Sequence, residues 1–286
     1  MRVLVTGEAG FTAHYVLPLL ASAGHETVGM EADITDPAAV EARIAALFAQ
    51  EAIAPQAVLH LAGISFAPDG VDAGVYAVNT VGTTTLLAAL SRAPHPPRRV
   101  VLASSAHVYG LGAGLLNETS ALAPVTHYGA SKLAMEYLVR PFEALGIVVA
   151  RPFNYTGPGQ SPRFLVPKLV EAFRARREEL HLGNRHVARD FSDVRRVARA
   201  YLALIEAEAP PAIINLCSGQ AVSIDALLAV LEAETGHRPR IITDPAFVRR
   251  DEIAQQWGDA TLTDRLIGVP AAPVEDLLRW MLQNPS

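Results

Sequence analysis

Cysteine is almost absent from this sequence, since Cys217 is the only one among 286 residues. One cysteine excludes an intrachain disulfide, and it excludes the common zinc sites that several thiolates build. Histidine offers no replacement, because His181 and His186 stand on an expected loop without a carboxylate companion. We therefore expect no metal site, and the cysteine content suits a reducing, cytoplasmic setting.

An excess of positive charge is also lacking. The 24 lysines and arginines are outnumbered by 29 aspartates and glutamates, which gives a net charge of -5. Nucleic acids and anionic membranes attract proteins through positive charge, so neither is expected as the main partner. No apolar run approaches the roughly 20 residues that cross a bilayer, and the start of the chain lacks the apolar segment of a signal peptide. A small anionic ligand needs only a local patch and fits this composition.

What the sequence does have is apolar surface, because 50% of its residues are hydrophobic and only 19% are charged. Short β-branched runs, RVLVT, AVLHLA, RVVLAS and IVVAR, alternate with alanine- and leucine-rich stretches of helical periodicity. This alternation predicts an α/β fold in which helices cover both faces of a parallel sheet. Ligand-binding loops are then expected at the carboxyl ends of the strands.

Proline and glycine mark a boundary in RPFNYTGPGQSPRF, which begins at Arg151. We expect residues 1–153 to form the sheet domain, joined by residues from about 191 to 218, because AIINLCSG has the character of a strand that returns to the sheet. Residues from about 154 to 190 and from 219 to 286 would then form a smaller, discontinuous lobe. Ser223 and Gly236 are expected to cap a helix in it.

A glycine loop follows the first expected strand. In VLVTGEAGFTA, Gly7 and Gly10 stand where the strand turns into a helix, a pattern typical of dinucleotide binding through the pyrophosphate. Glu31 and Asp33 follow the second expected strand, and no lysine or arginine is expected near them to receive a 2'-phosphate. This favours NAD(H) over NADP(H). In the plainer interpretation, the same stretch merely starts a helix at Asp36.

Tyr128 and Lys132 in THYGASKLAMEYL are one helical turn apart, so their side chains share a face. An ammonium beside a phenol lowers the phenol pKa from its usual value near 10. Ser105 follows another expected strand in ASSAHVYG and could hold a carbonyl oxygen together with Tyr128. The three residues predict proton transfer coupled to hydride transfer, although a Tyr-x-x-x-Lys pair alone is usually surface decoration.

These motifs, with DITD, HLAG, VNTVGT, RPFNYTGPGQ, RDFSDV and NLCSG, resemble the extended short-chain dehydrogenase/reductase family over nearly the whole chain. The similarity is to its nucleotide-sugar epimerase/dehydratase branch, and in texture to the GDP-4-keto-6-deoxy-D-mannose reductases that form GDP-rhamnose. The resemblance implies a Rossmann domain for the nicotinamide cofactor, with the smaller lobe binding a nucleotide-diphosphate sugar. It also implies a homodimer, built on the helices near residues 81–92 and 132–142.

The resemblance further implies roles for individual residues. It makes Ser105, Tyr128 and Lys132 catalytic. The residues it implies for the cofactor are Gly7, Gly10, Phe11, Glu31, Asp33, Ile34, Leu61, Ala62, Gly63, Asn79, Tyr128 and Lys132. The residues it implies for a substrate, GDP-linked by preference, are Ser105, His107, Asn154, Arg189 and Arg249. At Arg249 the sequence VRRDE departs from the usual Arg-Pro of the family.

Three functions remain to be distinguished. The first is reduction of a 4-keto-6-deoxy hexose with Tyr128 as proton donor, the second is 4-epimerisation with a retained NAD, and the third is a noncatalytic dinucleotide sensor. The intact set of Ser105, Tyr128 and Lys132 argues against the sensor. Dehydration is disfavoured, because family dehydratases carry a glutamate where this chain has His107, which either packs or transfers protons.

Overall fold

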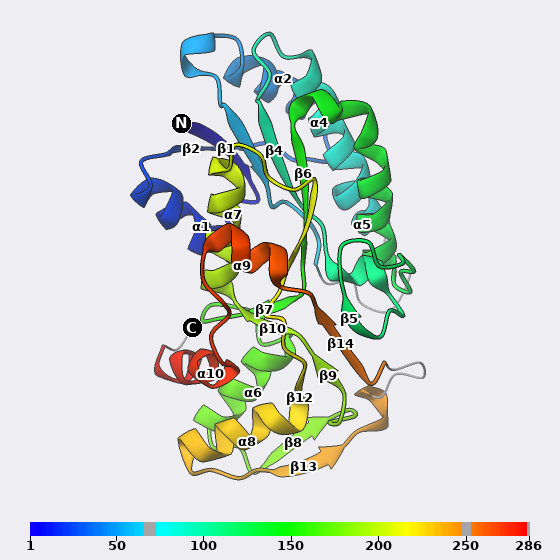
Figure 1. Ribbon diagram of the computed structural model, residues 1–286, viewed down its shortest axis with the longest axis vertical. Coiled ribbons are helices and arrows are strands. Elements are labelled where there is room, and N and C mark those ends of the chain that lie inside the picture. The colour runs from blue at the N-terminus through cyan, green and yellow to red at the C-terminus, as the bar shows by residue number, and fades with distance from the viewer. Residues whose placement is uncertain (66–72, 248–252, 285–286) are drawn as a thin grey trace.

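The computed structural model describes residues 1–65, 73–247 and 253–284. Its larger part is built on a six-stranded parallel sheet, and its smaller part lies beyond the carboxyl ends of those strands (Figure 1). The strands are, in spatial order, β11 (Ile213–Leu216), β6 (Ile147–Pro152), β4 (Arg99–Ala103), β3 (Ala57–His60), β1 (Arg2–Thr6) and β2 (Glu26–Gly29).

The central strands are buried on both faces, which explains their continuous apolar sequences. All four residues of β3 are buried, as are Val3 to Thr6 of β1. A parallel sheet with both faces covered requires this composition, because neither face meets water. The predicted α/β fold with a doubly wound parallel sheet is confirmed.

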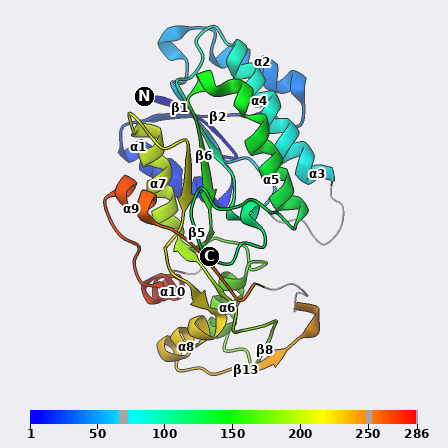
Figure 2. The same ribbon diagram turned by 45° about the vertical axis from the view of Figure 1, so that its right-hand side comes forward.

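Helices cover the two faces of the sheet as separate layers (Figures 1 and 2). One layer contains α1 (Phe11–Ser22), α7 (Val194–Glu206) and α9 (Thr261–Ile267). The other contains α2 (Pro37–Leu47), α3 (Ala73–Tyr76), η2 (Ala77–Gly82), α4 (Thr83–Arg92), α5 (His127–Leu138) and η4 (Arg140–Leu145). Asp36 caps α2 by accepting from the amides of Ala38 and Ala39, with Pro37 in the first turn, as expected.

The order of the strands creates a switch point beside β1. From β1 the chain goes to β2 on one side and then, through α2, to β3 on the other side. In open α/β sheets ligands bind where the order reverses in this way, at the carboxyl ends of the strands. The glycine loop after β1 and the loop after β3 therefore lie at the expected binding edge.

The helical run from Ala73 to Arg92 corrects one expectation from the sequence. Its 20 residues, with a mean hydropathy of 1.3, are long and apolar enough to cross a bilayer, which the sequence analysis did not anticipate. Half of this run is buried in the fold, and Thr80 and Thr83 direct their hydroxyls to backbone carbonyls. It packs on α2 and α5 as a core helix of the larger part, as Figure 2 shows.

The smaller part has its own apolar core, formed between three helices and a two-stranded parallel sheet. The elements are α6 (Leu165–Arg174), α8 (Ile224–Thr235), α10 (Val274–Gln283), β8 (Glu179–Leu182) and β13 (Arg240–Thr243). The predicted caps of α8 are confirmed, because Ser223 Oγ accepts from the amide of Ala226 at 3.0 Å and Gly236 takes a left-handed conformation with φ +60°.

Short strands join the two parts. They are β7 (Asn154–Thr156) paired with β10 (Phe191–Asp193), and a four-stranded sheet of β12 (Val222–Ser223), β9 (Ala188–Arg189), β14 (Gln255–Gly258) and β5 (Gly114–Leu116). The remaining short turns are η1 (Glu51–Ile53), η3 (Ala106–Tyr109) and η5 (Pro245–Phe247). The predicted division assigned α9 to the smaller lobe, whereas α9 packs on α7 and β11.

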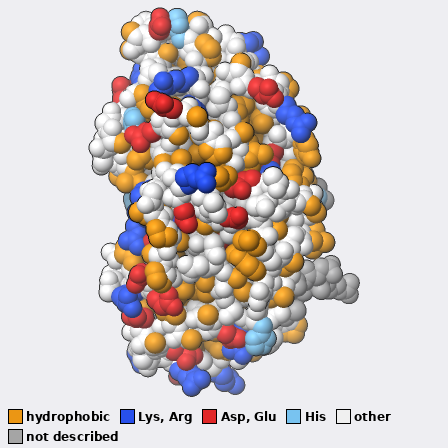
Figure 3. Space-filling model, in the orientation of Figure 1, with side chains coloured by type: hydrophobic (Ala, Val, Ile, Leu, Met, Phe, Trp, Pro, Cys, Tyr) orange, Lys and Arg blue, Asp and Glu red, His pale blue; other side chains and the backbone are white. Residues whose placement is uncertain are grey.

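The surface carries charges of both signs. On the face drawn in Figure 3, acidic and basic side chains of the described residues are interspersed rather than gathered into one large patch.

Candidate active site

The glycine loop has the conformation that a dinucleotide requires. Gly7 has a positive φ of +72°, and a Cβ there would lie 2.7 Å from the backbone nitrogen of Ala62. Only glycine therefore fits both the turn and the close approach of the loop after β3. Gly10 precedes α1, whose N-terminus has no side-chain cap, so the amides of its first turn can face a phosphate.

A positively charged side chain that sequence reasoning missed lies at the end of β2. Arg43 of α2 donates from Nε to the carbonyl of Met30 and from Nη2 to that of Gly29, both at 3.0 Å. Its Nη2 also lies 2.7 Å from Glu31 Oε2. The expectation that no arginine lies near Glu31 was therefore wrong, because α2 returns a residue that is remote in sequence to the end of β2.

The two acidic residues of this loop differ in their contacts. Glu31 is exposed, has a left-handed φ of 51° and receives the side chain of Arg43. Asp33 Oδ1 accepts from both the amide and the hydroxyl of Thr35, and these two bonds hold the Asp33 pKa below its usual value. Asp33 therefore shapes its own loop, whereas Glu31 points its carboxylate to the surface beside a cation.

The loop after β3 is built around Asn79. Its side-chain amide exchanges hydrogen bonds with the backbone of Ile64, at 2.9 and 3.1 Å, and donates to Ser131 Oγ on α5. A Cβ on Gly63 would lie 3.1 Å from both Asn79 Oδ1 and Lys132 Nζ. Buried Asn79 therefore joins the loop of Leu61, Ala62 and Gly63 to the helix that carries Lys132. Ile34 lies behind this region in the apolar core.

Ser105 and Tyr128 come together at the end of β4. Ser105 begins η3, its Oγ accepting from the amide of His107 at 3.2 Å, and its side chain is hydrogen-bonded to the hydroxyl of Tyr128. Thr126 positions Tyr128 by capping α5, with its Oγ1 accepting from the amide of Gly129. The serine and tyrosine hydroxyls can thus hold one oxygen atom of a ligand between them.

The pKa of Tyr128 differs from the expectation drawn from the sequence. Burial raises it to about 12, nearby Tyr155 adds to the rise, and the hydrogen bond with Ser105 opposes it. The sequence analysis expected Lys132 to lower this pKa, which is wrong for this structure. Lys132 instead donates from Nζ to the carbonyl of Ala103 at 2.7 Å.

Lys132 is itself strongly affected by its surroundings. Its side chain is 4% exposed, and burial lowers its pKa to about 8, whereas the charge of Glu136 raises it. Lys132 in turn helps to lower the pKa of His60, which burial brings to about 3. His60 is therefore a neutral core residue, and its ring nitrogens bond Thr6 and Thr83.

His107 lies against the tyrosine, as an exposed side chain. Its ring meets that of Tyr128 edge to face, with a centroid distance of 5.3 Å. This position allows either packing or proton transfer, so both interpretations stay open.

The expected sugar-diphosphate residues lie on the strands that join the two parts. Asn154 of β7 is exposed and donates to the carbonyl of Asp190 at 3.0 Å, while Arg189 of β9 donates from Nη1 to the carbonyl of Ala188 at 2.8 Å. These two residues are thus brought to the same junction. Arg249 lies outside the described residues.

Asp190, which sequence reasoning missed, organises this junction. It is fully buried, and its carboxylate accepts from the amide and hydroxyl of Ser218 and from the amides of Gly219 and Gly258. Burial raises its pKa, and these donors oppose the rise. Asp190 thereby ties β9, β14 and the loop after β11 together behind Arg189.

Aromatic residues connect α1 to the strand β7. Tyr155 shares a hydrogen bond of 2.7 Å with Thr12 Oγ1, and Phe11 stacks on Tyr155 with a centroid distance of 6.2 Å. Trp280 of α10 meets Tyr15 edge to face and receives the guanidinium of Arg195 over its ring. The first turns of α1 are therefore in contact with the strands that join the two parts and with α10 of the smaller part.

Histidine and acidic residues in the described ranges form no group of three that could hold a metal ion. The sequence analysis was nevertheless wrong to find no carboxylates near two histidines. His181 Nδ1 lies 3.7 Å from Asp244 and His186 Nδ1 lies 3.0 Å from Asp225. These are separate surface pairs.

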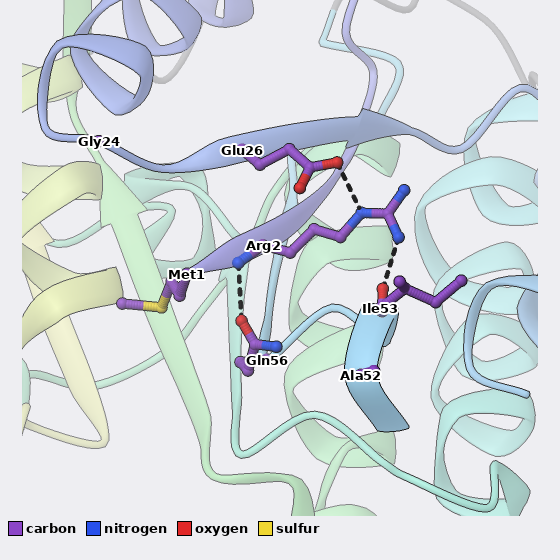
Figure 4. Close-up of a pocket in the computed structure, with 7 residues that line it drawn as sticks. All are labelled: Met1, Arg2, Gly24, Glu26, Ala52, Ile53 and Gln56. Atoms are coloured by element: carbon purple, nitrogen blue, oxygen red, sulfur yellow. Dashed lines mark hydrogen bonds and ion pairs between the residues drawn. The ribbon is translucent and has the colours of Figure 1, made fainter. Parts of the chain in front are cut away.

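A surface hollow of about 550 Å³ lies at the opposite, amino end of the sheet (Figure 4). Its polar groups are engaged with one another: Arg2 Nε lies 3.1 Å from Glu26, and the Arg2 amide donates to Gln56 Oε1 at 2.7 Å. Ligands of such sheets bind at the carboxyl ends, so this hollow is not the candidate site.

Comparison with known proteins agrees with this geometry. A model of the NAD dependent epimerase/dehydratase family matches residues 3–217. GDP-6-deoxy-D-talose 4-dehydrogenase from Aggregatibacter actinomycetemcomitans is 33% identical over 94% of this chain and 92% of its own. GDP-6-deoxy-D-mannose reductase from Pseudomonas aeruginosa is 32% identical over 99% of this chain and 96% of its own. The structure of RMD from Pseudomonas aeruginosa complexed with NADPH is 29% identical, with a TM-score of 0.86 over 99% of this chain and 98% of that one.

The family match includes the glycine loop, the serine after β4 and the tyrosine and lysine of α5, and the relatives cover the rest of the chain. The resemblance predicted from the sequence is thereby confirmed. This chain is a member of the NAD dependent epimerase/dehydratase family.

Proposed function

We propose that this protein is a nucleotide-sugar reductase that converts the 4-keto group of a GDP-linked 4-keto-6-deoxy hexose into an alcohol. The observation that carries the proposal is the convergence of Ser105, Tyr128 and Lys132 beside the loop after β3. The two relatives with GDP-linked deoxy sugars in their names support the choice of substrate.

A nicotinamide dinucleotide fits the residues that surround this group. Gly7, Gly63 and the uncapped start of α1 leave backbone surface where side chains would otherwise stand. When bound, the cofactor supplies the hydride that reduces the ketone carbon. Ser105 and Tyr128 hold the ketone oxygen by hydrogen bonds, and Tyr128 transfers its proton to that oxygen as negative charge develops there. Lys132 Nζ is held by the carbonyl of Ala103 and lies beside Gly63 of the loop after β3, where it can hold the cofactor.

Reduction is favoured over epimerisation by the names of two relatives, which are a dehydrogenase and a reductase of GDP-linked 6-deoxy hexoses. Burial raises the pKa of Tyr128, so its hydroxyl is protonated at neutral pH and can donate to a ketone oxygen. A 4-epimerase remains the second candidate, because the family description includes epimerases.

NAD(H) is the proposed cofactor in preference to NADP(H). The support is the acidic pair at the end of β2, because Glu31 can accept from a ribose hydroxyl and would repel a 2'-phosphate. Arg43 acts in the opposite sense, and its ion pair with Glu31 moderates the preference. Titration of the protein with NADH and NADPH, followed by fluorescence, tests the choice. Tighter binding of NADPH would reverse it.

A cytoplasmic homodimer is proposed as the working form. Its support is a set of exposed apolar side chains on the helical layer of η2, α4 and α5, where Val81 of η2 is 59% exposed and Tyr137 and Leu138 of α5 are 53% and 46% exposed. Two such surfaces packed together would bury these side chains, and α4 and α5 lie side by side in the larger part (Figure 2).

The decisive experiment mixes the protein with NAD(H) or NADP(H) and a panel of nucleotide sugars, including a GDP-linked 4-keto-6-deoxy hexose. Net oxidation of NADH with formation of a GDP-6-deoxy hexose supports the reductase. An epimer without net cofactor turnover supports the epimerase. Binding of cofactor with neither product would refute both and leave the sensor.

A further inference from the structure

We propose that Glu136 is a positioning residue for this site, resting on the proposed reductase function. Its carboxylate joins the loop of Ser105 to the helix of Tyr128 and holds Lys132 in the charged form.

The carboxylate of Glu136 lies in a buried ion pair. Arg151 of β6 donates from Nη2 to Oε2 at 2.6 Å and from Nε to Oε1 at 3.0 Å. The two side chains are only 3% and 7% exposed, for Arg151 and Glu136 respectively. A charge pair this deeply buried is costly to desolvate, so it is a weak source of stability, and its two hydrogen bonds fix the position of the Glu136 carboxylate.

Arg151 is itself held by further buried groups. Its Nη1 donates to the hydroxyl of Tyr109 at 3.0 Å and to the carbonyl of Glu118 at 3.1 Å. Tyr109 in turn donates to Asn215 Oδ1 at 2.6 Å. The guanidinium is thereby fixed against β11 and the turn η3, so Glu136 is attached to a rigid base.

Glu136 makes its second attachment at the end of β4. The hydroxyl of Ser104 donates to Glu136 Oε1 at 2.5 Å. Ser104 immediately precedes Ser105, whose hydroxyl meets Tyr128. One carboxylate therefore sets the distance between the strand end that carries the serine and the helix that carries the tyrosine.

The spacing along α5 places Glu136 behind the catalytic pair. Tyr128, Lys132 and Glu136 follow one another at intervals of four residues, so their side chains rise along the same side of the helix. Glu136 is thus the next side chain beyond Lys132, on the side away from Tyr128.

The other groups that face Lys132 leave the carboxylate of Glu136 as the charge that acts on the Lys132 pKa. His60 on β3 is neutral, with its pKa near 3, and Tyr128 is neutral with its pKa near 12. The guanidinium of Arg151 on β6 pairs with Glu136 and offsets part of its charge, yet the remaining effect of Glu136 on Lys132 is still to raise its pKa. The charge of Glu136 opposes the burial that lowers the Lys132 pKa to about 8. Without it, a larger share of Lys132 would be neutral at working pH.

The chain offers an unusually direct test, because it contains only two lysines, Lys132 and Lys168. Protein labelled with ¹³C at lysine Cε should give two side-chain resonances, and their titration reports each ammonium without any substrate. In the unaltered protein we expect the Lys132 resonance to titrate near pH 8.

The variant Glu136→Gln should lower the Lys132 midpoint by about one pH unit. Glu143→Gln, on the exposed turn η4 of the same layer, is the matched control and should leave that midpoint unchanged. If Glu136→Gln does not fold, Glu136→Asp replaces it, because the shorter side chain draws the charge away from Lys132. A midpoint that stays fixed in the folded variant overturns the electrostatic part of the proposal.

The positioning part is tested by Ser104→Ala, which removes one hydroxyl and keeps both charges. We expect kcat for the ketone substrate to fall about 10-fold or more with little change in KM, since a small misplacement of the serine affects the transition state most. The Lys132 midpoint should stay near 8 in this variant. An unchanged kcat in Ser104→Ala would overturn this part.

The two measurements separate this proposal from the reductase function. If no ketone substrate is turned over by the unaltered protein, the reductase proposal and the positioning part fail together. The midpoint of Lys132 in Glu136→Gln is measured without substrate, so the electrostatic part stands or falls by itself.

Discussion

Single residues in this site are adapted to chemistry at the expense of stability, and Lys132 is the clearest case. Its pKa is about 8 in the folded protein, against 10.5 ordinarily, so between these values the unfolded chain binds more protons. The free energy of unfolding should therefore rise with pH across this interval, and the contribution of Lys132 should stay constant at its lower level below pH 8.

Lys132→Met should consequently be more stable than the unaltered protein at pH 7, and inactive. Burial of the ammonium costs about 3 kcal/mol, from which the lost bond to Ala103 removes about 1 kcal/mol, leaving a gain of about 1–2 kcal/mol. Urea unfolding at pH 7 and at pH 10.5 measures the difference, which should shrink at the higher pH. A variant less stable at pH 7 would contradict the assigned cost.

Tyr128→Phe tests proton donation. Removal of the hydroxyl should lower kcat for the keto sugar by about 10²–10⁴-fold, while the Kd of NADH changes little. Stopped-flow reduction and a cofactor titration supply the two numbers. Tyr137→Phe, on the exposed side of the same helix, is the matched control and should retain activity. Equal losses in both variants would exclude Tyr128 as the donor.

Arg43→Ala tests the cation at the end of β2. It should weaken NADPH about 10-fold more than NADH, because only NADPH carries the 2'-phosphate that this guanidinium could meet. Arg92→Ala, which breaks a surface pair with Glu41, serves as control. Equal changes in the two Kd values would show that Arg43 merely supports the loop.

Sequence alone could predict residues that act through local spacing, and it failed for those that act across the fold. Tyr128 and Lys132 share a helix, and Gly7 follows a strand. A short stretch of consecutive residues is therefore enough to predict which groups lie beside them. Arg43 and Asp190 act through partners on other elements, and the ordering of those elements is not visible in any short stretch. Burial is equally nonlocal, which is why the direction of the Tyr128 pKa was missed.

At the scale of elements, the loops at the carboxyl edge of the sheet fit one another closely. Gly7→Ala should weaken NADH at least 10-fold, because a methyl group would lie 2.7 Å from the nitrogen of Ala62 and displace one of the two loops. Gly24→Ala is the matched control. It has a similar φ of +77° but nothing within 4 Å, so it should share the loss of stability, about 1 kcal/mol, without loss of affinity. Equal affinities in a calorimetric titration would contradict the predicted role of the loop.

Elements with strong periodicity or clear caps were predictable, as α2 and α8 illustrate. The division into lobes was harder to predict. Residues after 219 begin in the smaller part, yet α9 returns to pack on α7 because Leu262, Leu266 and Ile267 complete the apolar core beside the large sheet. The position of α9 depends on which apolar surface of the larger part the other elements leave uncovered. No local sequence pattern predicts this.

At the scale of the whole molecule, the proposed dimer predicts a particle of about twice 30.5 kDa in solution. Val81→Glu combined with Tyr137→Glu should give monomers, because like charges would face one another across the apolar surface. Ile53→Glu changes an apolar residue of similar exposure on a different element, η1, and should leave the mass unchanged. Light scattering decides, and a monomeric unaltered protein would remove the proposal.

The backbone passes between the larger and smaller parts repeatedly, through β6 to β7, β10 to α7, β11 to β12 and β14 to α9. Cleavage of any single connection would leave the others intact. A protease-nicked molecule should therefore migrate as fragments in a denaturing gel yet elute as one particle under native conditions. Neither half is a self-sufficient piece that could be exchanged between proteins by simple gene fusion.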